Sequence, residues 1–157
     1  MSTFTEYQMK NNGEGIPVLK KKRTYSNSEI QSLNKPENIA ALIEQMYDAS
    51  FLPEEHVWII AMDGQCHCKG IFEVSCGGMN YSIIDVRSIM TRILLVGGFQ
   101  FAVVHNHPSK SLKPSSEDSQ VCERLHNVGE LMQCQMVDSI IVSNGKYFSF
   151  SESKMIH

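Results

Sequence analysis

Apolar residues recur along this 157-residue chain with the two spacings that distinguish helices from strands. Three stretches carry apolar side chains three and four positions apart, which is typical of helices that bury one face. They begin near Pro36, Val86 and Ser116, and Gly97 is a suitable end for the second. Their apolar positions are Ile39, Leu42, Ile43 and Met46, then Val86, Ile89, Met90 and Ile93, then Val121, Leu125 and Val128.

Shorter and denser apolar runs between these helices predict strands. Asp63-Gly64 and Asn144-Gly145 are strong hairpin signals, and Gly77-Gly78 is expected to end a strand. The expected strands are residues 56–62, 65–75, 101–105, 136–142 and 146–150. The order of helix, hairpin, helix, strand, helix and hairpin predicts an α/β domain whose mixed β-sheet is covered by helices.

The composition favours a cytoplasmic protein. With 42% hydrophobic and 20% charged residues, the chain is sized for one globular domain with a substantial core. Five cysteines, an odd number without framework spacing, suit a reducing compartment better than a disulfide scaffold. The N-terminus lacks a basic and then apolar leader, and no apolar run approaches the length of a membrane span.

The first 26 residues differ from the rest of the chain. They are polar and carry five basic residues against two acidic ones, which predicts a flexible basic arm ahead of one domain at residues 27–157. The basic run is Lys20, Lys21, Lys22 and Arg23. It is either a solvated arm or a nucleic-acid contact, because clustered lysine and arginine attract phosphates. The net charge of −3 leaves the remainder acidic, which favours the solvated arm.

A candidate metal site lies between residues 101 and 118. His105 and His107 stand two positions apart at the end of an apolar run, so both can face one point from a strand. Asp118 falls in the first turn of the third helix and can reach the same point. Two imidazoles and one carboxylate leave a coordination position open, as in catalytic metal sites. The same ligands suit zinc or the ferrous iron of oxygenases.

Simpler explanations exist for these residues and for a second cluster. Ser115 and Asp118 also form the sequence of a capping box, which stabilises a helix without any metal. The stretch Cys66-His67-Cys68 suggests a structural zinc site. Alternate residues of a strand face opposite sides, however, and no second Cys/His pair lies nearby. We therefore expect no zinc site at residues 66–68.

The order of these residues resembles a known family. His105, His107, Pro108, Ser115 and Asp118 together resemble the JAMM motif of JAB/MPN-domain metalloproteases. The runs HNHPS and PSSED look still more like the bacterial RadC proteins, whose JAB-like domain carries HNHPSG and PS-x-x-D. The likeness covers about residues 30 to 153 and includes VSCGGMN at 74–80, residues 84–87 and residues 140–149.

The resemblance implies a JAB1/MPN (cytidine-deaminase-like) three-layer domain that binds one zinc ion through His105, His107 and Asp118. It also implies a glutamate that moves protons, and the family pattern Pro-x-Glu falls on Glu55. Ser115 stands where a hydroxyl could stabilise a developing oxyanion. The rivals of Glu55 are Glu54 and Glu73. Departures from the family pattern, none at a metal ligand, are Ser88, Lys110 and Ser139.

We therefore expect a zinc-dependent hydrolase of the JAMM type that cleaves a peptide or isopeptide bond of a peptide or protein partner through metal-activated water. The alternative is a DNA-repair or DNA-processing accessory protein of the RadC type, which would bind nucleic acid through the basic run at residues 20–23. A motif indicates chemistry rather than pathway, so the substrate and the oligomeric state stay open.

Overall fold

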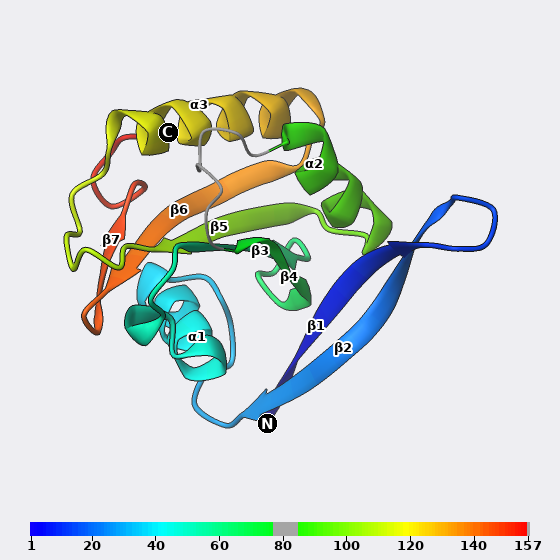
Figure 1. Cartoon of the computed structure of the whole chain (residues 1–157), viewed down its shortest axis with the longest axis horizontal. Coiled ribbons are helices and arrows are strands. Elements are labelled where there is room, and N and C mark those ends of the chain that lie inside the picture. Colours follow the sequence, from blue (N-terminus) through cyan, green and yellow to red (C-terminus); the bar gives the residue numbers. More distant parts are fainter. Residues whose placement is uncertain (77–84, 157) are drawn as a thin grey trace.

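The computed structural model describes residues 1–76 and 85–156, and its elements follow one another as drawn in Figure 1. The strands are β1 (Ser2–Asn11), β2 (Pro17–Asn27), β3 (His56–Met62), β4 (Cys68–Cys76), β5 (Gln100–Asn106), β6 (Gln135–Ser143) and β7 (Lys146–Ser149). The helices are α1 (Pro36–Tyr47), α2 (Val86–Leu95) and α3 (Ser116–Leu131), and a short 3-10 helix, η1, covers Ala49–Phe51. None of the described helices is both long enough and apolar enough to cross a membrane.

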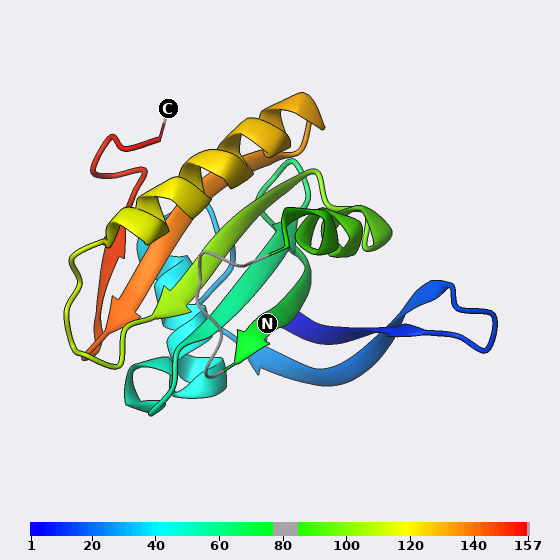
Figure 2. The same ribbon diagram turned by 45° about the horizontal axis from the view of Figure 1, so that its top comes forward.

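The seven strands of the described residues join one mixed sheet in the order β2-β1-β4-β3-β5-β6-β7. The neighbours β1–β4 and β5–β6 run parallel, and the other neighbours run antiparallel. Helix α1 covers one face of the sheet, and α2 and α3 cover the other (Figures 1 and 2). The predicted mixed sheet between helical layers is therefore confirmed.

The central strands β3 and β5 are apolar on both faces because both faces are covered. Val57, Ile59 and Ala61 of β3 belong to the core under α2 and α3, whereas Trp58 and Ile60 belong to the core against α1. Every residue of β3 from position 57 to position 62 is buried, which confirms the predicted doubly buried strand. The end of β5, which carries His105 and leads directly into His107, is thus anchored in the middle of the molecule.

The helix ends follow the signals seen in the sequence. Pro36 occupies the first turn of α1, and Gly97 closes α2 with a φ of 73°. The capping box at the start of α3 forms between Ser115 and Asp118. The three described helices bury most of the predicted apolar stripe, although Val86 and Val128 are only partly buried.

The two predicted hairpins differ in how closely they match the structure. Asn144 and Gly145 both adopt positive φ, of 52° and 71°, so this tight turn forms as expected. After Asp63, β4 pairs antiparallel with β3 as predicted, but it begins at Cys68 rather than at residue 65. The connection is longer because the Asp63 carboxylate accepts hydrogen bonds from the backbone N–H groups of Gln65 and His67. The predicted break at Gly77-Gly78 lies outside the described residues, as do residues 79–84.

The N-terminal residues form strands, so the expectation of a flexible arm is wrong. β1 and β2 pair antiparallel, and β1 joins β4 at the register Glu6↔Ile71. Phe4 is buried in the core against α1, and the buried Glu6 carboxylate binds Arg23 at 2.7 Å and Lys22 at 3.4 Å. The ion pairs join the two strands of the hairpin, and the buried Phe4, the pairing with β4 and a hydrogen bond from Arg23 to the Met46 carbonyl hold it to the rest of the fold. The division into residues 1–26 and 27–157 stays a prediction.

Candidate metal centre

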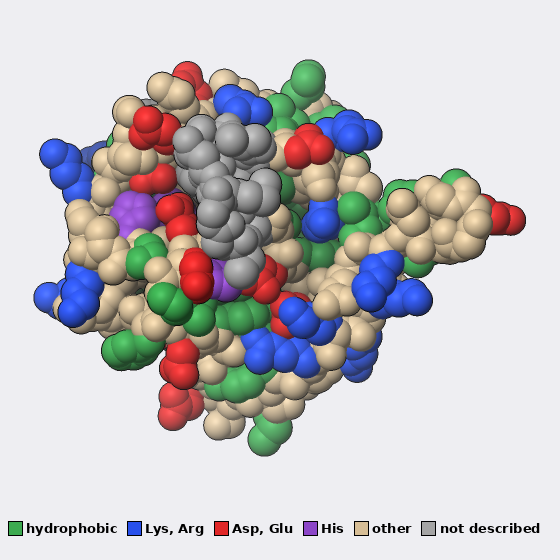
Figure 3. Space-filling view, in the orientation of Figure 1, with side chains coloured by type: hydrophobic (Ala, Val, Ile, Leu, Met, Phe, Trp, Pro, Cys, Tyr) green, Lys and Arg blue, Asp and Glu red, His purple; other side chains and the backbone are tan. Residues whose placement is uncertain are grey.

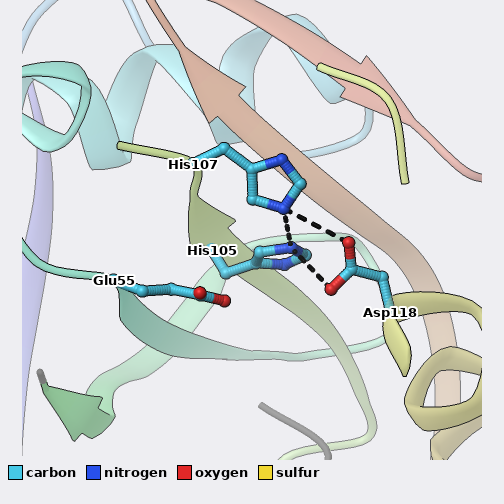
Figure 4. A group of neighbouring side chains, drawn as sticks. All are labelled: Glu55, His105, His107 and Asp118. Atoms are coloured by element: carbon cyan, nitrogen blue, oxygen red, sulfur yellow. Dashed lines mark hydrogen bonds and ion pairs between the residues drawn. The ribbon is translucent and has the colours of Figure 1, made fainter. Parts of the chain in front are cut away.

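Three donor side chains meet where β5 ends and α3 begins. His105 is the penultimate residue of β5, His107 follows the strand, and Asp118 lies in the first turn of α3. The Nε2 atoms of the two histidines lie 3.1 Å apart. The Asp118 carboxylate places Oδ1 3.3 Å from His105 Nε2 and Oδ2 3.2 Å from His107 Nε2 (Figure 4). The predicted convergence of these residues is present.

The strand and its partners explain how the histidines are aimed. His105 pairs across the sheet with Val57, which belongs to the core under α3, so its imidazole points to the α3 side. The chain then leaves the strand, and His107 Nδ1 lies 2.8 Å from the carbonyl of Ser111. This contact with the Ser111 carbonyl orients the imidazole so that its Nε2 is directed at the other donors. Ser143 donates to the His107 carbonyl at 2.8 Å and fixes the same turn.

Asp118 is held by the capping box. Its backbone N–H donates to Ser115 Oγ at 3.0 Å, and its Oδ2 accepts from the Ser115 N–H at 2.8 Å. The simpler explanation of this residue and the metal explanation are therefore compatible. The cap supplies the orientation, and the remaining carboxylate lone pairs face the histidines.

The charges of the site are strongly coupled. Burial opposes ionisation of Asp118, but hydrogen bonds from His105 and His107 outweigh it and hold the pKa of the carboxyl well below its usual range. Burial likewise lowers the pKa of His107, but its hydrogen bonds to Asp118 and to the Ser111 carbonyl raise that pKa overall. The carboxylate is thus ionised at neutral pH, as a ligand of a cation must be.

Glu55 approaches from the opposite side of the site. It directly precedes β3, and one carboxylate oxygen lies within 4.8 Å of the donor atoms of His105, His107 and Asp118. Figure 4 shows its carboxylate pointing to the shared space from the side opposite Asp118. Within residues 1–76 and 85–156, these four side chains form the cluster with metal-ligand character.

Glu55, His107 and Asp118, with His105 buried behind them, border a cleft of about 430 Å³. Its walls are Glu55, His107, Pro108, Ser109, Ser111, Lys113, Ser115, Glu117 and Asp118. Ser115 is exposed here, and because its Oγ already accepts from the backbone, its O–H can donate into the cleft. A substrate group in this cleft would meet imidazole, carboxylate and hydroxyl together.

The donor set fits a metal ion. Two ligand atoms at about 2.0–2.1 Å from one tetrahedral zinc are roughly 3.3 Å apart. The separations of 3.1, 3.2 and 3.3 Å among His105, His107 and Asp118 match this spacing. Nitrogen and carboxylate donors of this kind serve zinc and other first-row metals, so the geometry supports a metal without naming it.

A family model described as a RadC-like JAB domain matches residues 33–155. The chain belongs to this family. Similar curated proteins bear the name UPF0758 protein. The one from Clostridium tetani is 27% identical over 141 residues, covering 90% of this chain and 61% of the relative. The one from Desulfitobacterium hafniense is 30% identical over 120 residues, covering 76% and 52%, and that from Clostridium botulinum is 31% identical over 137 residues, covering 87% and 59%.

This RadC-like domain spans between about half and three fifths of the length of those relatives. The matched region contains all four clustered residues and begins after the β1–β2 hairpin. The recognition made from the sequence is thus confirmed at the level of family and fold.

The rivals of Glu55 lie elsewhere in the RadC-like domain. Glu54 is exposed, and its carbonyl accepts a hydrogen bond from Asn106 at 2.9 Å. Glu73 contacts His56, and His56 stacks on Trp58 with the ring planes 10° apart, in the core against α1. Glu73 therefore occupies the face of the sheet opposite His105. The proton-transfer role of Glu55 and the oxyanion role of Ser115 stay predictions.

Sequence reasoning missed the residues that support the site. Asn106, between the two histidines, is buried and bonded to residues 54 and 56, and Ser143 and Ser111 orient His107. Only Asn106 carried a signal, because a polar residue inside an apolar strand end demands a partner.

Proposed function

We propose that this protein is a zinc-dependent hydrolase of the JAMM type that cleaves a peptide or isopeptide bond. The observation that carries the proposal is the convergence of two imidazoles and one ionised carboxylate, with a second carboxylate opposite them, at the edge of one open cleft. JAB-domain proteins include hydrolases, and the family match supports this class of chemistry. The chain spans only part of the length of its relatives. The activity is therefore proposed for this chain and not for the full-length relatives.

Zinc is the metal that the proposal assigns to His105, His107 and Asp118. Three protein ligands with an open position are typical of catalytic zinc sites. When bound, zinc lowers the pKa of a water ligand towards neutrality and polarises a carbonyl oxygen. The alternative ion is ferrous iron, which two histidines and one carboxylate also bind in oxygenases.

The remaining residues of the cleft have separate tasks in the proposed hydrolysis. Glu55 takes a proton from the attacking water and delivers it to the leaving amine. Its approach from the side opposite Asp118 leaves it outside the capping interactions that hold that residue. Ser115 donates its hydroxyl hydrogen to the oxygen that becomes negative as the carbonyl turns tetrahedral.

The test begins with metal-replete protein and a panel of fluorogenic peptides and isopeptide-linked model substrates. We expect hydrolysis that a chelator abolishes and that added zinc restores. Failure of the zinc-loaded protein to hydrolyse any member would contradict the proposal. Oxygen-dependent turnover with bound iron would favour the oxygenase instead.

A second candidate function is nucleic-acid binding in DNA repair or processing, and one observation favours it. Lysine and arginine side chains gather over β1 and β2 (Figure 3), and Lys20 and Lys21 are exposed on the outer strand. Lys22 and Arg23, by contrast, bind the buried Glu6. We expect any such binding to weaken steeply with salt and with a Lys20→Gln, Lys21→Gln double change. Salt-independent binding would contradict it.

A further inference from the structure

We infer that Asn106 is a positioning residue that fixes Glu55 beside the metal ligands. The inference rests on the proposed function, because it gives Glu55 a place in that reaction. Asn106 itself faces away from the donors and reaches Glu55 only through the backbone on either side of it.

The side-chain amide of Asn106 bridges the two residues that flank Glu55. Its Oδ1 accepts from the His56 N–H at 2.6 Å, and its Nδ2 donates to the Glu54 carbonyl at 2.9 Å. Asn106 is 1% exposed, so these bonds are shielded from water. Both polar ends of one short side chain thus hold a segment about fifty positions earlier in the chain.

The sheet shows why a side chain is needed at this point. The β3–β5 ladder ends with the pair Val57↔His105, so His56 would be the next residue opposite Asn106. The chain after β5 instead follows β6, with Asn106 opposite Val142 and the His107 N–H donating to the Val142 carbonyl at 3.1 Å. The pairing between β5 and β3 therefore ends just where the backbone next to Glu55 needs a partner. The Asn106 amide takes the place of the missing peptide group and extends the ladder by one step.

The alternation of the strand links this clamp to the metal donors. His105 and His107 flank Asn106 and point to one side, whereas Asn106 points away from them. A rigid three-residue segment therefore carries two metal ligands and the anchor of Glu55. A displacement of the clamp would change the distance between Glu55 and the donors without removing any donor.

Only an amide of this length meets both demands. Aspartate would keep the acceptor for His56 but would place a carboxylate oxygen against the Glu54 carbonyl. Leucine has a similar size and would leave both backbone groups without their partner. Asn106→Asp therefore removes the Glu54 half of the clamp, and Asn106→Leu removes both halves.

The first measurement is hydrogen exchange of backbone amides in metal-free protein, which needs no activity. Loss of one hydrogen bond should speed exchange of the His56 amide by about fivefold in Asn106→Leu. Asn106→Asp should leave that amide slow. A matched control is Asn27→Leu, because Asn27 Oδ1 accepts from the N–H groups of Glu29 and Ile30, both at 2.7 Å. The control should speed exchange of the Ile30 amide and leave exchange of the His56 amide unchanged. Unchanged exchange of the His56 amide in Asn106→Leu would overturn the inference.

The second measurement separates positioning from general destabilisation. Asn106→Leu should retain its metal and its KM and lose about 10²-fold in kcat, whereas Asn27→Leu should retain kcat. In a Glu55→Gln background the same change should lower kcat no further than about twofold, since its effect runs through Glu55. An equal loss in both backgrounds would overturn the positioning role. Absence of hydrolysis in the wild type would instead refute the proposed function, while the exchange of His56 still decides the clamp.

Discussion

The sequence contains two clusters of residue types that bind metals, at residues 105–118 and 66–68. The donor atoms converge in the first cluster and do not converge in the second. In the first, His105, His107 and Asp118 bring their donor atoms to within 3.3 Å of one another. In the second, Cys66 adopts a φ of 63° in the loop before β4 and accepts from the Gln100 side chain. Closeness along the chain is greater in the second cluster, yet only the first converges.

The difference lies in what holds each side chain. His67 is exposed and binds Asp63 at 3.1 Å, and Cys68 begins β4 with its side chain against the core that faces α1. Each residue of the cysteine cluster thus has a separate partner. At the candidate metal centre, β5, the following turn and α3 supply one donor each, and a capping box and a carbonyl orient Asp118 and His107. Convergence requires supporting hydrogen bonds from neighbouring elements, not ligand types in sequence.

The largest expected effect is loss of the metal. We predict that purified protein carries about one zinc per chain and that His107→Ala abolishes it, because two remaining ligands cannot retain the ion. Elemental analysis after extensive dialysis measures this directly. The matched control is the double change Cys66→Ser, Cys68→Ser, which should leave the metal content unchanged. Metal loss in that control would move the site to the cysteine cluster.

The next effect concerns the carboxylate that faces the donors. Glu55→Gln should keep its metal and lose about 10²- to 10⁴-fold in kcat, because the amide cannot accept a proton. Glu54→Gln and Glu73→Gln should remain active, since the first is exposed and the second lies on the other face of the sheet. Steady-state rates on any substrate that the wild type cleaves decide the assignment. An inactive Glu73→Gln beside an active Glu55→Gln would show the base to be misplaced.

A smaller effect is expected at Ser115, which caps α3 and faces the cleft. Ser115→Ala should lose about 10²- to 10³-fold in kcat with the oxyanion donor, and about 1 kcal/mol of stability with the cap. Glycine at an N-cap costs only a few tenths of a kcal/mol, so Ser115→Gly should lose the rate alone. Kinetics and denaturant unfolding of both variants separate the two roles. Full activity in Ser115→Gly would leave Ser115 as a cap only.

Local patterns predicted most of the fold and the donors because they depend on few residues. Helical periodicity located α1, α2 and α3, and the His-x-His spacing with a helix N-terminus located the three side chains that converge at the candidate metal centre. These signals act within one turn or one strand, so no distant residue needs to be known.

The failures came where a distant partner decides the structure. The sequence of residues 1–26 resembles that of a charged arm. In the structure, Phe4 packs in the core and Glu6 forms an ion pair with Arg23. The lysines of the outer strand β2 also fit a structural role. Lysine on an edge strand discourages that strand from pairing with another chain. Asn106 is of the same kind, because its partners are some fifty residues away and local pattern cannot indicate them.

The smallest expected effect concerns the cysteine cluster and follows from burial. Burial raises the pKa of the Cys68 thiol to about 12, so the folded state binds that proton more tightly than the unfolded state does. The resulting stability is fully present below the ordinary thiol pKa of about 9 and is lost as pH rises towards 12. Near pH 10 the loss should be about 1 kcal/mol.

Cys68→Ala isolates this contribution, because other groups titrate equally in both proteins. We expect the free energy of unfolding of the wild type to fall by about 1 kcal/mol more than that of Cys68→Ala between pH 7 and pH 10. Urea unfolding at the two pH values measures the difference. An equal fall in both proteins would mean that Cys68 ionises readily in the folded state, as a zinc ligand must. That result would weaken the contrast between the converging His105, His107 and Asp118 site and the dispersed cysteine cluster, because Cys68 would then have the ionised thiol that a metal ligand needs.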